Sequence, residues 1–490
     1  MTTKTLGAAI SAARNGLIAV SFAACATTAG APSPASPRVT IDAGTLEGRI
    51  DSASGAMAFN GIPYAAPPVG DLRWRAPQPV THWDRVRDAS RIGLNCMQHR
   101  PYGDIDAQAR GTSEDCLYLN VWTSATTGNR PVMVWIHGGG FFAGFGGEER
   151  HNPGPLVAKG AVVVTVNYRL GALGFLAHPA LAADAATHTS GNYGLMDQIA
   201  ALQWVKRNIA RFGGDPSRVL IFGESAGAMS VGTLIGSPLA KGLFQRAVLE
   251  SGTGTALIAR TPAAEATGEK LAAAVGVSGS DAAAAVRLRA VRADSIVGAA
   301  VRIAPNPGSP MFWPVIDGYV LPHAVDSAIV QGTANLVPVI VGSNRDEPHE
   351  IFGGPARALA RMMSAKGVPT YLYVFSRAGE DSASQRAGAY HSAEITFVFG
   401  RPVPLSPFAG HTSYDARLAD AMSDYWVAFA TNADPNGAPA AGKWPRWPEF
   451  SAANDAYLEL GSEIVAKAEY RRAMYDSLDV QARQGGQIRP

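Results

Sequence analysis

Short apolar runs alternate with longer amphipathic stretches along most of the chain. The runs are rich in Val and Ile and lack alternating polar positions, which is typical of strands buried on both faces. We predict such strands at residues 131–136, 161–167, 219–222 and 337–341. Helical spacing marks residues 195–211 and the Ala-rich stretches 262–274 and 281–300. This alternation indicates an α/β fold with a mainly parallel central sheet and helices on both faces.

The first strong chemical signal is a serine between glycines at residues 223–227, Gly-Glu-Ser-Ala-Gly. It follows the predicted strand at 219–222 and precedes a helical run, which is the context of a nucleophile elbow. Glycines on both sides allow a turn sharp enough to raise the Ser225 hydroxyl above the sheet. We therefore predict Ser225 as a nucleophile. The alternative is a helix start that Ser225 merely caps.

A second glycine-rich segment, residues 137–141 (His-Gly-Gly-Gly-Phe), follows the predicted strand at 131–136. Attack on an ester carbonyl creates an alkoxide, which preorganised backbone N–H groups stabilise. We expect Gly139 and Gly140 to supply two of these donors and Ala226 a third, with His137 positioning the loop. Phosphate binding is the rival interpretation, but the segment matches neither GxGxxG nor a loop ending in GKS or GKT.

A serine nucleophile also needs a general base and an acid that orients the base. In this class of fold, the acid and then the histidine follow the serine along the chain. Asp346 and Glu347 come directly after a predicted strand. Spacing alone leaves four histidines open as the base, namely His323, His349, His391 and His411. His391 begins the segment His-Ser-Ala-Glu, which lacks the HExxH arrangement of a zinc site.

The N-terminus has the features of an export signal. Positive charges at Lys4 and Arg14 precede a short apolar run at residues 16–24, which is too short to span a bilayer. We predict a signal peptide over residues 1–25, a flexible tether over 26–37 and a single domain over 38–482. Cleavage after an Ala-Cys-Ala sequence would release a periplasmic or secreted protein. A lipobox ending at Cys25 would instead give an outer-membrane lipoprotein, and a tail without a targeting role is a third alternative.

Composition and cysteine count narrow the function further. The chain has 490 residues, 42 Lys and Arg against 40 Asp and Glu, and no basic stretch interleaved with aromatics, so nucleic-acid binding has no support. With Cys25 cleaved or lipidated, Cys96 and Cys116 remain as a pair. Export favours a disulfide between them, closing a loop of about 20 residues that stabilises by about 3 kcal/mol. Two free buried thiols are the alternative.

Taken together, these motifs resemble the carboxylesterase type B family, which includes the cholinesterases. The resemblance covers nearly everything after residue 40 and rests on residues 61–70, 114–122, 137–141, 191–198, 212–227, 343–347, 391–400 and 434–437. It implies an α/β-hydrolase fold with helical insertions around an active-site gorge. It also implies Ser225, Glu347 and His391 as the triad, Gly139, Gly140 and Ala226 as oxyanion donors, a Cys96–Cys116 disulfide, and a structural salt bridge between Arg73 and Glu114.

Three departures from that family bear on the substrate. No Trp lies between Cys96 and Cys116, so recognition of a quaternary ammonium by a Trp in that loop is unsupported. Pro348 follows Glu347 where the family commonly has glycine. Only 44 residues separate Glu347 from His391, which is shorter than usual and predicts a more open site.

The resemblance implies serine-dependent hydrolysis of a small-molecule carboxylic ester through an acyl-enzyme, without a cofactor or metal. A non-catalytic binding module and hydrolysis of amides or lactones by the same triad are the alternatives. Three aromatic residues are candidates for lining the substrate pocket: Phe141, Phe312 and Trp313.

Overall fold

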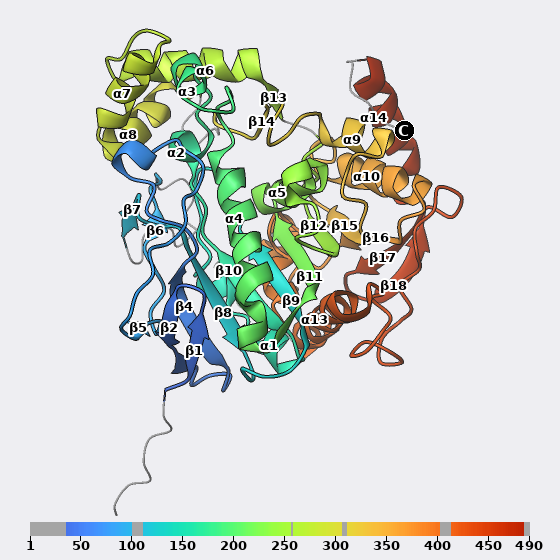
Figure 1. Cartoon of the computed structure of the whole chain (residues 1–490). Coiled ribbons are helices and arrows are strands. Elements are labelled where there is room, and N and C mark those ends of the chain that lie inside the picture. The colour runs from blue at the N-terminus through green and yellow to red at the C-terminus, as the bar shows by residue number, and fades with distance from the viewer. Residues whose placement is uncertain (1–35, 100–110, 256–257, 306–310, 402–412, 485–490) are drawn as a thin grey trace, which may run out of the picture. The chain divides into compact units, whose positions relative to one another are not determined.

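The computed structural model describes residues 36–99, 111–255, 258–305, 311–401 and 413–484. The described residues from Ser36 onward belong to one compact unit (Figure 1). The predicted signal peptide, the tether before residue 36 and Cys25 lie outside the described residues, as does His411. No helix in the described part is both long and apolar enough to cross a membrane.

An 11-stranded sheet forms the centre of the fold. Its strands, in spatial order, are β18 (Ile464–Ala468), β17 (Ala456–Leu460), β16 (Thr370–Phe375), β15 (Val339–Asn344), β12 (Arg246–Glu250), β11 (Gly214–Glu224), β9 (Arg130–Ile136), β10 (Val162–Val166), β8 (Tyr118–Thr123), β4 (Met57–Pro63) and β3 (Arg49–Ile50). Neighbours from β17 to β10 pair in parallel, and the strands at both edges pair antiparallel. The expected α/β fold with a mainly parallel sheet is therefore confirmed.

Both faces of the sheet are covered, as continuous apolar strands require. Along β9, Val132, Val134 and Ile136 pack into one hydrophobic core, whereas Met133 and Trp135 pack into a second core on the opposite face. Helices α4 (Tyr193–Asn208), α5 (Ala226–Gly236) and α10 (Gly353–Ala365) contribute to the first core, and α12 (Ile395–Val398) and α13 (Ser413–Asn432) contribute to the second.

Further helices and small sheets surround this frame (Figure 1). The other helices are α1 (Gly154–Ala158), α2 (Gly171–Phe175), α3 (Pro179–Ala183), α6 (Thr261–Ala274), α7 (Ala282–Ala290), α8 (Ala293–Ile303), α9 (Val325–Gln331), α11 (Ser382–Ala387) and α14 (Arg472–Gln484). The small sheets pair β1 (Arg38–Ile41), β2 (Gly44–Glu47) and β5 (Arg87–Asp88); β6 (Asn95–Cys96) and β7 (Thr112–Ser113); and β13 (Ala259–Arg260) and β14 (Val315–Ile316). The predicted helix at 281–300 is two helices, because the backbone is extended at Val291 and Arg292.

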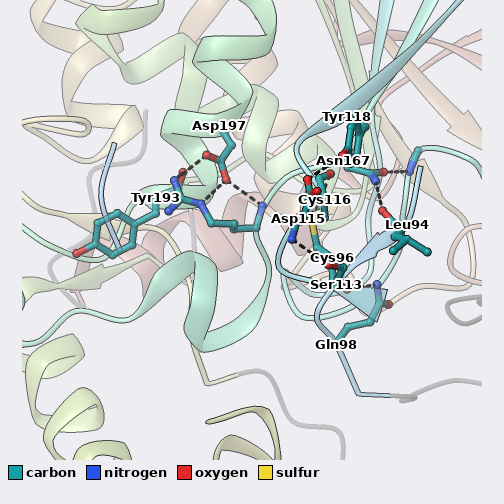
Figure 2. The surroundings of a disulfide bond; sticks show 12 residues. Leu94, Cys96, Gln98, Ser113, Asp115, Cys116, Tyr118, Asn167, Tyr193 and Asp197 are labelled. Atoms are coloured by element: carbon teal, nitrogen blue, oxygen red, sulfur yellow. Dashed lines mark hydrogen bonds and ion pairs between the residues drawn. A yellow bond between two sulfur atoms is a disulfide. The ribbon is translucent and has the colours of Figure 1, made fainter. Parts of the chain in front are cut away.

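The predicted disulfide between Cys96 and Cys116 is present (Figure 2). Both cysteines are almost fully buried. The salt bridge implied by the resemblance is also present, with Arg73 and Glu114 joined by two contacts of 2.5 and 2.6 Å. Both interactions cross-link the segment between β4 and β8 to itself.

Candidate active site

Ser225 lies at a sharp turn between β11 and α5. Its backbone has φ 56° and ψ −122°, a conformation that non-glycine residues rarely adopt and that recurs at functional sites. A Cβ on Gly223 would come within 2.5 Å of the Ile136 carbonyl oxygen, and one on Gly227 within 2.0 Å. Only glycines fit at these two positions, so the Gly-x-Ser-x-Gly pattern follows directly from the close approach of β9.

The structure brings the three residues of the expected triad together. His391 Nε2 lies 2.8 Å from Ser225 Oγ, and His391 Nδ1 lies 2.5 Å from Glu347 Oε1. Glu347 follows β15, and His391 lies in the loop after α11. Since β15 and β16 are parallel neighbours, the loops that leave them meet at the edge of the sheet where Ser225 lies.

Hydrogen bonds to its second carboxylate oxygen hold Glu347 in place. Its Oε2 accepts hydrogen bonds from the Asn344 backbone N–H at 2.6 Å and the Ser251 hydroxyl at 3.0 Å. The carboxylate is buried, so these donors replace water and fix its orientation toward His391.

The other candidate histidines are elsewhere. The His349 ring contacts Tyr470 and Tyr475, and its Nδ1 lies 3.0 Å from the Tyr475 hydroxyl. His323 is exposed on the loop before α9. Of the histidines that the structure describes, His391 is therefore the one bonded to Ser225.

Buried carboxylates surround His391. Glu224 Oε1 lies 3.2 Å from Nε2, while Glu394 accepts a hydrogen bond from Asn344. Burial lowers the pKa of His391, but the charges of Glu224, Glu347 and Glu394 outweigh it and raise the pKa to about 9. Burial and the charges of Glu224 and Glu347 raise the pKa of Glu394 to about 8.

Single ligand atoms of Glu224, Glu347 and His391 lie within 4.8 Å of one another, a spacing that a cation could bridge. His391, however, points one nitrogen at Ser225 and the other at Glu347. A ring that uses both nitrogens in this way is arranged to move a proton between serine and substrate, and this arrangement fits acid–base chemistry better than metal ligation.

The predicted oxyanion donors lie on the loop after β9 and at the start of α5. Gly139 and Gly140 have φ of 97° and 62°, and a Cβ at Gly139 would come within 2.3 Å of the Ala143 carbonyl oxygen. The Gly139 carbonyl accepts hydrogen bonds from Phe142 and Ala143. Among the described residues, no turn or loop hydrogen bond uses the N–H of Gly139 or Gly140. These N–H groups are available to a substrate.

His137 contacts the backbone of this loop and supports it. Its ring stacks on Tyr168 at 4.5 Å, and its Nδ1 lies 2.8 Å from the Gly138 carbonyl oxygen. Burial lowers the pKa of His137 to about 4, so the ring is neutral at physiological pH and Nδ1–H donates to that carbonyl. The contact fits the loop-positioning role expected from the sequence.

The segment next to Cys96 also supports the oxyanion loop, the loop after β9 that carries Gly139 and Gly140. Gln98 accepts a hydrogen bond from the Gly144 N–H at 2.9 Å and donates to the Cys96 and Gly144 carbonyls at 3.0 and 3.1 Å. Asn167 accepts a hydrogen bond from the Gly146 N–H at 2.8 Å and donates to the Leu94 carbonyl (Figure 2). No sequence motif marks Gln98, and its position two residues after Cys96 is the one local signal of this contact.

Phe352 contacts the catalytic histidine and was not predicted from the sequence. Its ring stacks on His391 with a centroid distance of 4.6 Å and an interplanar angle of 22°. Phe352 comes from the short segment after Glu347, and no sequence motif marks it. Of the aromatic residues predicted to line the pocket, Phe141 is fully buried against Phe175 and Trp313, so it belongs to the core.

A strained serine between β11 and α5, hydrogen-bonded to a histidine and an acid from later loops of a mainly parallel sheet, defines a serine hydrolase of the α/β-hydrolase fold. The chain belongs to the carboxylesterase family, whose model matches residues 35–352 and 349–478. Enzymes of this family hydrolyse carboxylic esters. The two matched stretches overlap at residues 349–352, shortly after Glu347, in the segment that we expect to be shorter than is usual in the family.

Relatives of known activity resemble most of the chain. A fumonisin B1 esterase from Sphingopyxis macrogoltabida is 36% identical over 86% of each chain. A para-nitrobenzyl esterase from Bacillus subtilis is 34% identical over 90% of this chain and 98% of its own. Among solved structures, a PNB esterase aligns with a TM-score of 0.80 at 32% identity, and the Geobacillus stearothermophilus carboxylesterase EST55 aligns with 0.79 at 31% identity, each over 90% of this chain and 99% of its own.

Proposed function

We propose that the protein hydrolyses small carboxylic esters through an acyl-enzyme in which Ser225 is the nucleophile. His391 Nε2 takes the hydroxyl proton as Ser225 Oγ attacks the carbonyl carbon. The alkoxide that forms accepts hydrogen bonds from the N–H groups of Gly139, Gly140 and Ala226. The bond to the leaving alcohol then breaks, and His391 returns the proton to that oxygen.

Water completes the cycle. It attacks the acyl-enzyme carbonyl, gives its proton to His391, and releases the acid when Ser225 Oγ regains a proton. Glu347 orients His391 throughout, and the nearby Glu224 carboxylate stabilises the imidazolium. The observation that carries this proposal is the continuous hydrogen-bonded chain from Ser225 through His391 to Glu347.

The substrate class follows from an apolar pocket beside the oxyanion loop. Among the residues that the structure describes, its lining includes no Lys, Arg, Asp or Glu. It consists of Met97, Gln98, His99, Phe142, Leu170, Gly171, Ala172, Val297, Ala300, Val301, Ala304, Met311 and Phe312. Burying a charged group here would leave it unpaired, which is strongly unfavourable. We therefore assign a neutral, apolar acyl or alcohol group to this pocket, with Phe312 in the lining role expected from the sequence.

A fluorophosphonate probe and a substrate panel test this proposal. Wild-type enzyme should label at Ser225 and hydrolyse p-nitrophenyl butyrate, while Ser225→Ala should lose labelling and about 10⁴-fold or more in kcat. His391→Ala should match that loss, and His349→Ala should not. A Ser225→Ala variant with native circular dichroism and more than about a hundredth of wild-type kcat would overturn the assignment.

Amide and lactone hydrolysis is the second candidate, since the same triad can attack those carbonyls. Matched p-nitrophenyl esters and p-nitroanilides of the same acyl group separate the two activities. We expect the ester to be preferred in kcat/KM, because p-nitrophenolate leaves readily whereas the anilide nitrogen must be protonated as it departs. A preference for the anilide would reassign the substrate class.

Export is a further part of the proposal, supported by the apolar run at residues 16–24 and by the disulfide between Cys96 and Cys116. Disulfides persist in oxidising compartments. Labelling with radioactive palmitate distinguishes a lipoprotein anchored through Cys25 from a cleaved, soluble protein. A wild-type protein that carries label, with Cys25→Ser unlabelled, supports the lipid anchor; mature protein in the periplasm or medium without label supports cleavage.

A further inference from the structure

The residue after the catalytic histidine has a strained backbone. Ser392 has a φ of 73°, in the left-handed region that residues other than glycine rarely adopt. It is the third residue of a tight turn, in which the Ala393 N–H donates to the Tyr390 carbonyl oxygen at 3.1 Å. The Asn344 side chain anchors the turn by donating to the same carbonyl oxygen at 2.7 Å. Glycine or asparagine is favoured where this turn position has a positive φ, and a strained residue there often has a function.

The Ser392 hydroxyl reaches a carboxylate of the active site. It donates a hydrogen bond of 2.7 Å to Glu224 Oε1, and the same oxygen lies 3.2 Å from His391 Nε2. Glu224 is only 2% exposed, so protein groups largely replace water around its carboxylate. One buried oxygen therefore joins the Ser392 hydroxyl to the histidine nitrogen that faces Ser225.

The charge on Glu224 depends on a balance of opposing effects. Burial raises the pKa of its carboxyl, whereas the charge of His391 and the hydrogen bond from Ser392 lower it. Loss of that donor would shift the balance toward the neutral acid, which stabilises an imidazolium poorly. Other titratable groups face Glu224 from the surrounding elements: Arg150 from the segment before α1, Glu250 from β12, Glu347 from the loop after β15, Tyr373 from β16 and Glu394 from the residue before α12.

We propose that Ser392 is a positioning residue for the base, because its hydroxyl fixes the Glu224 carboxylate beside His391. The strained turn brings this hydroxyl within hydrogen-bond reach of Glu224 Oε1. A fixed carboxylate next to Nε2 stabilises the imidazolium that forms as Ser225 attacks, with no reorganisation during the reaction. The inference rests on the proposed function, since it concerns the same base and nucleophile.

Removing the hydroxyl tests this inference. Ser392→Ala should move the acid limb of the kcat/KM profile to lower pH by about half a unit, because a more neutral Glu224 raises the pKa of His391 less. The plateau of kcat should fall about threefold. Ser392→Gly also relaxes the backbone and should give the same shift, and Ser382→Ala, at an exposed serine of α11, should match wild type. A shift in Ser392→Gly alone would assign the effect to the backbone and overturn the inference.

Two further measurements show whether Ser392 acts through Glu224. In a Glu224→Gln background, Ser392→Ala should shift the acid limb by less than about 0.2 units, and an equal shift in both backgrounds would overturn the inference. NMR titration of labelled histidine follows the pKa of His391 directly, with His391→Gln identifying its resonance. A lower pKa in Ser392→Ala supports the inference, and an unchanged pKa overturns it. This titration needs no ester hydrolysis, so an inactive wild-type enzyme would refute the proposed function while the titration still decides the role of Ser392.

Discussion

Replacing Glu224 by Gln tests the electrostatic design around His391. The Glu224 carboxylate lies 3.2 Å from His391 Nε2 and is one of three carboxylates that raise the pKa of His391 to about 9. A base with a raised pKa stays protonated at neutral pH, and kcat/KM falls as the pH drops below that pKa. Removing a negative charge lowers the pKa of His391, so the acid limb of the pH profile moves to lower pH.

The size of the shift follows from the distance and the exposure. Unit charges about 4 Å apart near a protein surface interact by about 4 kcal/mol. The His391 side chain is 36% exposed, so water screens much of this interaction. After screening, we expect about a third of this interaction energy to remain. It corresponds to a shift of about one unit in the pKa of His391. At high pH the effect reverses, because Glu224 no longer stabilises the imidazolium and the plateau of kcat falls.

The assay is the pH dependence of kcat/KM with p-nitrophenyl butyrate. The reaction is followed at the wavelength where the product absorbs equally as p-nitrophenol and as p-nitrophenolate. Glu149→Gln is the matched control, because Glu149 is exposed and pairs with Arg401 away from the site. An acid limb that stays within about 0.3 units of wild type would refute the reasoning. It would mean that burial keeps Glu224 protonated, since burial also raises the pKa of Glu224.

Three further changes test the scaffold around the site. Gln98→Ala should lower kcat about tenfold, because displaced oxyanion donors stabilise the alkoxide poorly. It should also lower the free energy of unfolding by about 1–3 kcal/mol, because its buried backbone partners lose their hydrogen bonds. Gln385→Ala, at an exposed side chain, should do neither. Phe352→Leu should lower kcat about 2- to 10-fold through the lost ring stacking on His391, and an unchanged kcat would show that the stacking does not position the base. Replacing Cys96 and Cys116 with Ser should lower the free energy of unfolding by about 3 kcal/mol in urea titrations; a loss under about 1 kcal/mol would contradict the loop-closure argument.

The strands that position the nucleophile were predictable because they are buried on both faces. β9 and β10 are continuous, largely apolar runs rich in β-branched residues, and their boundaries agree with the predicted runs within one residue. β11, which precedes Ser225, begins five residues before its predicted run, at Gly214 rather than Val219. β16 was not predicted, since its sequence Thr-Tyr-Leu-Tyr-Val-Phe alternates polar-tipped aromatics with apolar residues. Tyr373 is nevertheless fully buried against Trp426 and Trp447, so packing decides what the pattern leaves open.

The pairing of Glu347 with His391 shows a second limit of the sequence. Spacing left four histidines equivalent, and only the family resemblance selected His391. Glu347 and His391 come together because β15 and β16 are parallel neighbours, so both strands end at the same edge of the sheet. This pairing is a property of the fold and is not visible in the spacing of residues along the chain. Contacts such as Phe352 on His391 and Gln98 on Gly144 join loops distant in sequence, and no local periodicity records such contacts.

The short segment after Glu347 connects these observations to selectivity. It contains α10, β16 and α11 before His391, and it places Phe352 against the catalytic base while leaving the His391 side chain 36% exposed. Water that reaches the base weakens the electrostatic interactions there, because screening rises with exposure. Discrimination between substrates must then come from the apolar pocket beside Phe142, where one methylene is worth about 1–3 kcal/mol. Because His391 is partly exposed beside Phe352, we predict that bulky groups of a substrate are tolerated on this side of the site.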